Sequence, residues 1–332
     1  MGCPHLCVFC NQRTISGTTA RIPTKNQINN HIKQYLAFNN KPRPIIQVAF
    51  FGGNFLGLPE TIILSLLEAV DPFVNDKVVD SIRFSTRPDT IHQERLKLLS
   101  GFPVSTVELG VQSMNNRVLE AAERGHLTSD TVEAVRLLKA SGYDVGLQMM
   151  VGLPADDDAG AMKTAARIAA LKPDFVRIYP TVVLKGSTLA QLYNTGRYHP
   201  MPLADCVTLV KRIFLYFSTH RIPVVRMGLQ DSDGLTPEGE LLAGPYHPAF
   251  GHLVHSEIAL DAVSMALVEM NYRSQPLTIT THPAMVSRVQ GLRKKNIEKL
   301  KQTFGLETVN LIQNASIPKD RLVVAGKQVM LR

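Results

Sequence analysis

The sequence predicts an α/β fold, in which short buried strands alternate with helices along most of the chain. Two observations support this. Between residues 45 and 230, short runs rich in β-branched and aromatic residues recur, and the segments between them carry apolar residues at helical spacing. Strict alternation of strand and helix builds right-handed units around a parallel sheet. A chain of 332 residues with 45% apolar residues can bury a substantial core under such a sheet.

The expected elements follow in order along the chain. The predicted strands are residues 45–51, 81–85, 106–110, 145–150, 175–179 and 224–227. The predicted helices between them are residues 61–70, 93–99, 131–140, 161–171 and 205–217. In parallel sheets ligands collect at the C-terminal ends of the strands. This rule selects the turns 52–54, 86–89, 112–113, 152–154 and 180–181, although each turn taken singly is also typical of an ordinary βα connection.

After residue 230 the alternation stops. Residues 231–250 are predicted as a loop-rich crossing into a helix at 253–270, followed by a strand at 277–281, a basic helix at 286–303 and strands at 308–313 and 321–325. We therefore predict two domains. Residues 1–230 form the core domain, and residues 231–332 form a helical linker and a small basic α/β module.

The formal net charge of +8 is concentrated near the C-terminus. Residues 285–332 hold ten Lys and Arg against three acidic residues. Such a basic patch suits a polyanionic partner such as RNA, and the alternative is a solvated basic helix face. No apolar run approaches the roughly 20 residues that span a bilayer, and no secretion signal precedes the first strand. We expect a cytoplasmic protein that does not contact a membrane.

Three of the four cysteines lie within the first ten residues, as Cys3-Pro-His-Leu-Cys7-Val-Phe-Cys10. A loop here can aim three thiolates at one point, where they ligate three irons of a cubane and leave the fourth iron open. An open iron can chelate S-adenosylmethionine (SAM). The alternative is zinc bound by the three cysteines and His5, but the usual two ligand knuckles separated by a longer span are missing. Cys206 lies in an apolar helical pattern and is expected to be core.

A series of further motifs carries a resemblance to a known family. In order and spacing, the cysteine motif and the later motifs resemble the radical SAM domain of the Elongator catalytic subunit over residues 2–230, and more distantly oxygen-independent coproporphyrinogen oxidase. The motifs are Phe51-Gly-Gly-Asn-Phe55, Ser85-Thr-Arg-Pro-Asp89, Val107-Glu-Leu-Gly-Val-Gln-Ser113, Arg124-Gly-His126, Met149-Met-Val-Gly-Leu-Pro154 and Arg177-Ile-Tyr-Pro-Thr181.

The resemblance implies a partial (β/α)6 TIM-like barrel of radical SAM type with a small C-terminal α/β module. It implies a [4Fe–4S] cluster on Cys3, Cys7 and Cys10, SAM as cofactor, and a reductant such as flavodoxin or ferredoxin. The SAM contacts it implies are Phe9 beside the adenine, Gly52 and Gly53 at the amino group, Ser85 and Gln112 near the ribose, and Arg124 at the carboxylate. For Arg124 the alternative is a salt bridge at a helix end.

The chain departs from these relatives at several points. Ser85 stands where relatives have a ribose-binding Glu, and Gln148 where coproporphyrinogen oxidases have an Asp, which weakens the case for porphyrin chemistry. The C-terminal part lacks an acetyl-CoA loop, because Arg293 occupies a position that requires Gly or Ala. Residues 291–300 resemble a KH-type RNA module without its GxxG loop. Relatives place a strand directly before the cysteines, so we expect either an upstream start or a missing first strand.

Three functional hypotheses follow. The first is a radical enzyme that modifies RNA, such as tRNA, bound through the basic module. The second is a radical enzyme acting on a small metabolite, and the third is a non-catalytic homologue that binds metal or RNA. Arg177, Tyr179 and Lys185 lie at or beyond a strand end and are candidates to face the substrate, or else they are rim residues that pack on neighbouring loops.

Overall fold

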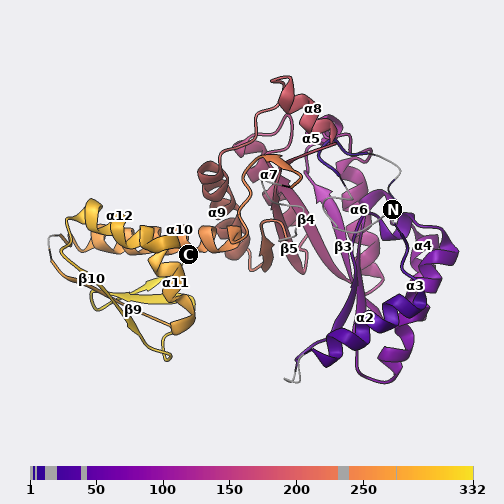
Figure 1. Ribbon diagram of the computed structural model, residues 1–332, viewed down its shortest axis with the longest axis horizontal. Helices are drawn as coiled ribbons and strands as arrows, with labels where there is room; N and C mark the ends of the chain where they lie inside the picture. The colour runs from indigo at the N-terminus through magenta and orange to yellow at the C-terminus, as the bar shows by residue number, and fades with distance from the viewer. Residues whose placement is uncertain are drawn as a thin grey trace.

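The computed structural model describes residue 3 and residues 6–11, 21–38, 43–230, 239–273 and 275–331. Its centre is a parallel sheet of six strands in the order β1-β2-β3-β4-β5-β7 (Figure 1). β1 and β7 end this order without pairing with each other, so the described strands form an open half-barrel, which confirms the predicted fold class. The strands are β1 (Gln47–Phe50), β2 (Ser81–Thr86), β3 (Val104–Gln112), β4 (Asp144–Val151), β5 (Phe175–Pro180) and β7 (Val224–Met227).

Helices cover the outer face of the sheet: α2 (Lys25–Ala37), α3 (Glu60–Asn75), α4 (Gln93–Leu99), α6 (Thr128–Ala140), α7 (Asp158–Ala170) and α9 (Leu203–Thr219). Two short helices, α5 (Asn116–Ala121) and α8 (Thr188–Asn194), lie instead at the rim formed by the C-terminal ends of the strands (Figure 1). Because strand side chains alternate between faces, Ile82 and Phe84 of β2 are fully buried in the core beneath the helices. Arg83 and Ser85, on the other face of the same strand, are only half-buried. The inner face of the half-barrel is therefore polar and accessible.

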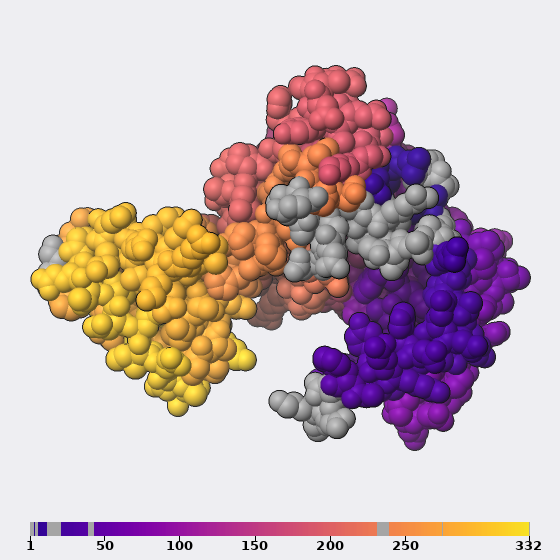
Figure 2. Space-filling view, in the orientation of Figure 1, coloured from indigo at the N-terminus to yellow at the C-terminus, as the bar shows by residue number. Residues whose placement is uncertain are grey.

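A second, smaller sheet forms the C-terminal module, in the order β10-β9-β11-β12. Its strands are β9 (Leu277–Thr281), β10 (Val309–Gln313), β11 (Arg321–Val324) and β12 (Lys327–Met330). Three helices accompany it: α10 (Phe250–Glu269), α11 (Val286–Gln290) and α12 (Lys295–Phe304). This module projects from one side of the half-barrel, as its yellow surface in Figure 2 shows.

Helix α10 belongs to both hydrophobic cores. Phe250 and Val254, near its start, are buried in the core of the half-barrel, whereas Val263 and Leu267, further along, are buried in the core of the module. A helix that is apolar on all sides has to be covered on all sides. Here the core of the half-barrel covers the start of α10, and the core of the C-terminal module covers its later part. The predicted division at residue 230 stays a prediction, and α10 is the element that joins the two parts.

The structure corrects three details of the predicted elements. The helix expected at 286–303 is two helices, because the backbone turns left-handed at Gly291, Arg293 and Lys294. A last strand, β12, follows a tight turn in which Ala325 and Gly326 both have positive φ, the conformation of a two-residue type I′ hairpin. Within the expected loop 231–250, β8 (Leu241–Ala243) pairs with β6 (Val183–Leu184).

None of the helices in the described part of the chain is both long enough and apolar enough to cross a membrane.

Candidate functional site

The cysteine loop is fixed to the rim of the half-barrel by backbone hydrogen bonds. The Val8 N–H donates to the carbonyl of Ala122 at the end of α5 (3.1 Å), and the Val8 carbonyl accepts from Leu189 at the start of α8 (2.7 Å). The Asn11 amide donates to the carbonyl of Lys185 (2.7 Å). Two helices distant in sequence therefore hold the loop at the C-terminal edge of the sheet.

The three thiols of this loop lie near one another. Cys7 is buried, Cys10 is half-buried and Cys3 is exposed. Burial, followed by the charges of Cys7 and Cys3, raises the pKa of Cys10 to about 11, against the opposing effect of the Arg124 guanidinium. Burial also raises the pKa of Cys3, followed by the charge of Cys7. Raised pKa values favour the neutral thiols of Cys3 and Cys10, and a bound cation would favour their thiolate forms.

The zinc alternative depends on His5, which lies outside the described residues. Among the residues that the structure describes, no group of three or more His, Cys, Asp and Glu is arranged around a single metal ion.

Arg124 connects the cysteine loop to β3. Its Nη1 donates to the sulfur of Cys7 (3.3 Å), and its Nη2 donates to the carbonyl of Gly110. Its Nε is buried without a hydrogen-bond partner. A Cβ atom at Gly110 would lie 3.2 Å from Nη2 of Arg124 and 3.1 Å from Nε2 of Gln112. The missing side chain of Gly110 therefore gives both residues room to lie against the strand.

Gln112 ends β3 in a strained conformation. Its φ of 66° is in the left-handed region, at a position where the register between β3 and β4 shifts. Such strain in a residue other than glycine occurs mostly at functional positions. The side-chain Oε1 is buried without a partner, so a buried hydrogen-bond acceptor is available. At the end of β1, Gly52 and Gly53 have φ of 113° and 108°, which favours glycine at both positions.

A buried arginine, Arg87, supports this edge of the sheet and was not among the predicted site residues. It is 1% exposed, forms two 2.9 Å hydrogen bonds with Asp89, and donates to the carbonyl of Arg124. The Arg87 N–H also donates to the side-chain oxygen of Asn54 (3.1 Å). The Ser-Thr-Arg-Pro-Asp motif was the available signal, but only the structure shows that Arg87 and Asp89 position Arg124.

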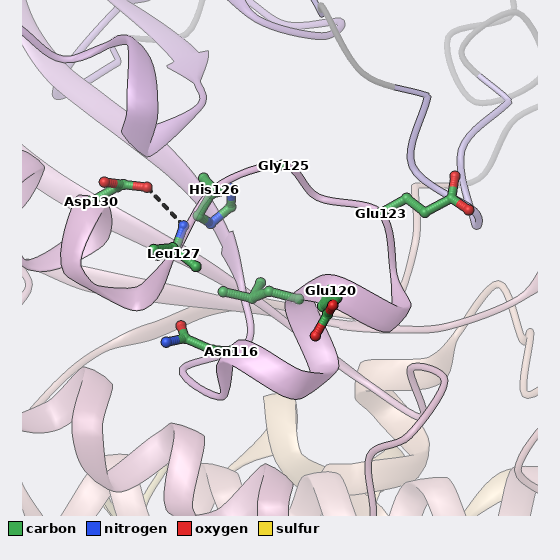
Figure 3. Close-up of a pocket in the computed structure, with 8 residues that line it drawn as sticks. Asn116, Glu120, Glu123, Gly125, His126, Leu127 and Asp130 are labelled. Atoms are coloured by element: carbon green, nitrogen blue, oxygen red, sulfur yellow. Dashed lines mark hydrogen bonds between the residues drawn. The ribbon is translucent and has the colours of Figure 1, made fainter.

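His126, the last residue of the Arg-Gly-His motif, is buried beside Arg124. Burial and the charges of Arg124 and Arg87 lower its pKa to about 3, so the imidazole is neutral near pH 7. It also borders an open hollow of about 730 Å³ between α5 and α6 (Figure 3). The hollow is lined by Asn116, Leu119, Glu120, Glu123, Gly125, His126, Leu127 and Asp130, and Asp130 accepts from the N–H of Leu127 (2.7 Å). None of the predicted cofactor ligands lines this hollow.

The predicted ribose-side residue Ser85 lies on the inner face of the sheet. Its hydroxyl accepts from Nε2 of Gln148 (3.4 Å), and the same amide donates to the carboxylate of Glu108 (2.9 Å). Register places Ser85 directly beside Glu108 on the neighbouring strand. The position where relatives have a glutamate therefore adjoins a glutamate on β3.

The three candidate substrate residues divide into two groups. Arg177 lies on the inner face and pairs with Glu108 at 2.7 Å from Nε to Oε2. Tyr179 lies two residues further along β5, on the same face of the strand, and burial raises its pKa. Lys185 is exposed at the rim, where its Nζ donates to the carbonyl of Gly239 (2.6 Å). Phe9 is half-buried against Val118, Ala122 and Met150, between the cysteine loop and the strand ends.

The residues at this edge fit the cofactors that the motifs predict. Three cysteines lie on one short loop, and the sulfur of one of them, Cys7, accepts from the Arg124 guanidinium, so the residue types suit a metal cluster on thiolates. Next to them the structure leaves three buried polar atoms without partners: Oε1 of Gln112, Nε of Arg124 and Nη1 of Arg87. Buried polar atoms of this kind normally have a partner, so a polar ligand with both donors and acceptors is expected here. SAM has an ammonium, a carboxylate and ribose hydroxyls, and it meets that requirement.

Comparison with known proteins identifies the class. The family model for the radical SAM superfamily matches residues 1–168, and the model for the Radical_SAM C-terminal domain matches residues 173–259. The chain therefore belongs to the radical SAM superfamily and is an enzyme of that class. Membership implies a [4Fe–4S] cluster and SAM.

Individual relatives point to Elongator-like proteins within the superfamily. The chain is 31% identical over 222 residues to an uncharacterized protein of Methanocaldococcus jannaschii, a match covering 63% of this chain and 67% of that protein. It is 34% identical over 128 residues to the tRNA uridine(34) acetyltransferase of the same organism, covering 38% of this chain and 24% of the relative. It is 30% identical over 188 residues to Elongator complex protein 3 of Danio rerio, a match covering 51% of this chain and 34% of the relative.

A solved structure supports the fold. The Elp3 protein of Methanocaldococcus infernus matches with a TM-score of 0.59 at 21% identity, covering 76% of this chain and 61% of that chain. The matched regions of the acetyltransferase and of Elongator complex protein 3 are about a quarter and a third of those proteins. The likeness therefore concerns the radical SAM region.

Proposed function

We propose that this enzyme binds a [4Fe–4S] cluster through Cys3, Cys7 and Cys10 and cleaves SAM reductively. A cluster held by these cysteines would supply the electron, drawn from a reductant such as flavodoxin or ferredoxin, for the cleavage of SAM that makes hydrogen abstraction from a substrate possible. The protein's own residues bind and orient the reactants.

The observation that carries this proposal is the position of Arg124. One side of its guanidinium contacts the Cys7 sulfur, and Nε on the other side is buried without a partner within reach of the strand end. A guanidinium so placed stabilises thiolate charge and can also bind the carboxylate of SAM. Gln112 offers an acceptor to the ribose or ammonium group, and the bare backbone at Gly52 and Gly53 allows close approach.

Anaerobic reconstitution with iron and sulfide, followed by reduction with SAM present, tests the proposal. We expect about four irons per chain and release of 5′-deoxyadenosine. Replacement of Cys3, Cys7 or Cys10 by Ala should abolish both signals. The matched control is Cys206→Ala, because Cys206 lies on the buried face of α9, in the core, and should not affect iron. One zinc per chain without SAM cleavage would overturn the proposal.

We further propose that the substrate is an RNA, such as tRNA, bound through the C-terminal module. Arg293, Lys294 and Lys295 are consecutive, exposed residues in the break between α11 and α12. No ion pair involving them occurs among the described residues, whereas Lys299 and Lys327 pair with Glu257 and Glu269. Three exposed, uncompensated cations at one turn are the kind of site that contacts phosphates. The name of the archaeal relative, a tRNA uridine(34) acetyltransferase, agrees with this choice.

The test compares two triple variants with equal change in charge. Replacement of Arg293, Lys294 and Lys295 by Ala should weaken tRNA binding and lower the slope of log K against log salt by about 2. The control replaces Lys33, Arg117 and Lys163, which are exposed on α2, α5 and α7, and should alter binding little. Equal loss in both variants, or unaltered binding after deletion of residues 285–332, would reject the RNA proposal. A small metabolite would then be the substrate to seek.

A further inference from the structure

A buried carboxylate on the inner face of the half-barrel, Glu108, accepts three side-chain hydrogen bonds. Oε1 of Glu108 contacts Nη2 of Arg83 and accepts from Nη2 of Arg177 (3.2 Å). Its Oε2 accepts from Nε2 of Gln148 (2.9 Å) and lies 2.7 Å from Nε of Arg177. Oε1 therefore accepts two hydrogen bonds and Oε2 accepts one, while Nε of Arg177 is close to Oε2 as an ion pair but is left without a hydrogen-bond partner among the described residues. Most of the acceptor capacity of Glu108 is thus committed to neighbouring side chains, and a donor of Arg177 remains unsatisfied.

The arginines around Glu108 carry positive charge that it does not neutralise and hydrogen-bond donors that have no partner. Among the described residues, Glu108 is the only carboxylate that pairs with Arg83 or Arg177, so one positive charge is uncompensated. Nε of Arg83 is buried without a hydrogen-bond partner. Arg226 on β7 is the register neighbour of Arg177, and its side chain donates only to backbone carbonyls, those of Gly228 and Leu229. The inner face is therefore short of negative charge.

Packing holds the two guanidinium groups in place. Arg177 lies over the ring of Phe51 at 5.6 Å, and Arg83 lies over the ring of Phe175 at 5.3 Å. Their side chains are 17% and 19% exposed, so the groups remain accessible from the concave side. A Cβ at Gly146 would collide with the Phe175 ring and lie 3.1 Å from Cγ of Glu108. The absence of a side chain on β4 thus lets Glu108 reach across that strand to Arg177.

We propose that this inner face binds an oxyanion of the substrate, a carboxylate or a phosphate ester, through Arg177 and Arg83. Glu108 is a positioning residue: it aligns the two guanidinium groups and leaves one net positive charge to be neutralised by the ligand. Arginine is suited to this task because its donors form charge-assisted hydrogen bonds with planar or tetrahedral oxyanions. The site lies on the inner face of β2, β3 and β5 and does not depend on the substrate being RNA.

Two single substitutions with opposite expected effects on anion binding test this proposal, and the measurement does not depend on catalytic turnover. The probes are acetate and inorganic phosphate, titrated into the reconstituted, oxidised enzyme at constant ionic strength, with binding measured as line broadening of the acetate methyl ¹H and the phosphate ³¹P signals. Arg177→Gln should weaken binding at least tenfold, because it removes the charge that faces the ligand. Glu108→Gln should tighten binding about tenfold, because it removes the competing negative charge.

The opposite directions separate binding from misfolding, since damage to the fold would weaken both variants. Arg117→Gln, an equal charge change at an exposed position on α5, should leave binding unchanged. Stronger broadening of acetate would identify a carboxylate ligand, and stronger broadening of phosphate a phosphoryl ligand. The proposal is wrong if neither anion binds, or if the Arg177→Gln variant binds anions as tightly as the unmodified enzyme. It is also wrong if the Glu108→Gln variant binds anions more weakly although its thermal unfolding transition shows that it is folded.

Discussion

Arg124 donates a hydrogen bond to the sulfur of Cys7 over 3.3 Å, across 117 positions of sequence. The contact joins the loop before the first described helix to the turn after α5. Because Arg124 is also bonded to the Gly110 carbonyl, the cysteine loop and the end of β3 form one unit. Any change in this arginine should affect the cluster site before it affects the fold.

Arg124→Gln should lower the affinity for the iron–sulfur cluster about 10- to 100-fold, the usual effect of removing a group that supports a metal ligand. Glutamine can still reach a carbonyl but cannot supply the positive charge beside the Cys7 sulfur. Iron retained per chain after dilution into a chelator measures the effect. Arg117→Gln serves as the control, and equal iron retention in the two variants would contradict the assigned role.

Asp89→Ala should destabilise the protein by about 3 to 5 kcal/mol, because it leaves the buried Arg87 without its paired carboxylate. Arg87 is 1% exposed and makes both of its side-chain ion-pair contacts to Asp89. Urea unfolding monitored by circular dichroism gives the free energy of unfolding. Replacing the exposed Asp76, for which no ion pair is seen among the described residues, should cost well under 1 kcal/mol.

Gly146→Ala should destabilise the half-barrel by about 1 to 3 kcal/mol, because the added methyl group overlaps the Phe175 ring. Combining it with Phe175→Leu should recover part of the loss, since the smaller side chain vacates that space. Free energies of unfolding of the two single variants and the double variant give the coupling between the positions. Simple additivity of the two losses would show that the two side chains do not compete for this space.

His255 should make the protein less stable in acid. Burial, followed by the charges of Arg288 and His252, lowers its pKa to about 4, and its ring packs edge-on against Phe214 at 5.1 Å. A folded pKa below the unfolded value near 6.5 means that the stabilisation is complete above pH 6.5 and is lost as the pH falls through 4. Between pH 7 and pH 4.5 the loss from this residue should be at most about 2 to 3 kcal/mol.

The measurement compares urea unfolding of the unmodified chain and His255→Phe at the two pH values. Both carry alanine at the three N-terminal cysteines, so that acid loss of a cluster does not intervene. Phenylalanine keeps an aromatic ring but cannot be protonated, so its stability should fall less. Parallel losses in the two proteins would exclude His255 as a cause.

Much of the half-barrel was predictable from local pattern. The six strands and five of the helices between them, α3, α4, α6, α7 and α9, were expected because buried parallel strands and amphipathic helices have distinct spacings of apolar residues. The short helices α5 and α8 were not predicted. The same patterns could not reveal β8 or β12, which are short and are defined by the strands they pair with. The break between α11 and α12 was also missed, because Arg293 and Lys294 are residue types that normally continue a helix.

The sequence by itself determined the class of protein, because three cysteines in one loop and motifs at successive strand ends are local features that survive without coordinates. Only the tertiary structure decided which charges meet. Glu108 is beside Ser85, Arg83 and Arg177 because parallel strands bring residues far apart in sequence into register. Arg87 supports Arg124 from another turn for the same reason. Long-range pairing of this kind depends on strand order and side-chain length together, and neither is encoded at any single position.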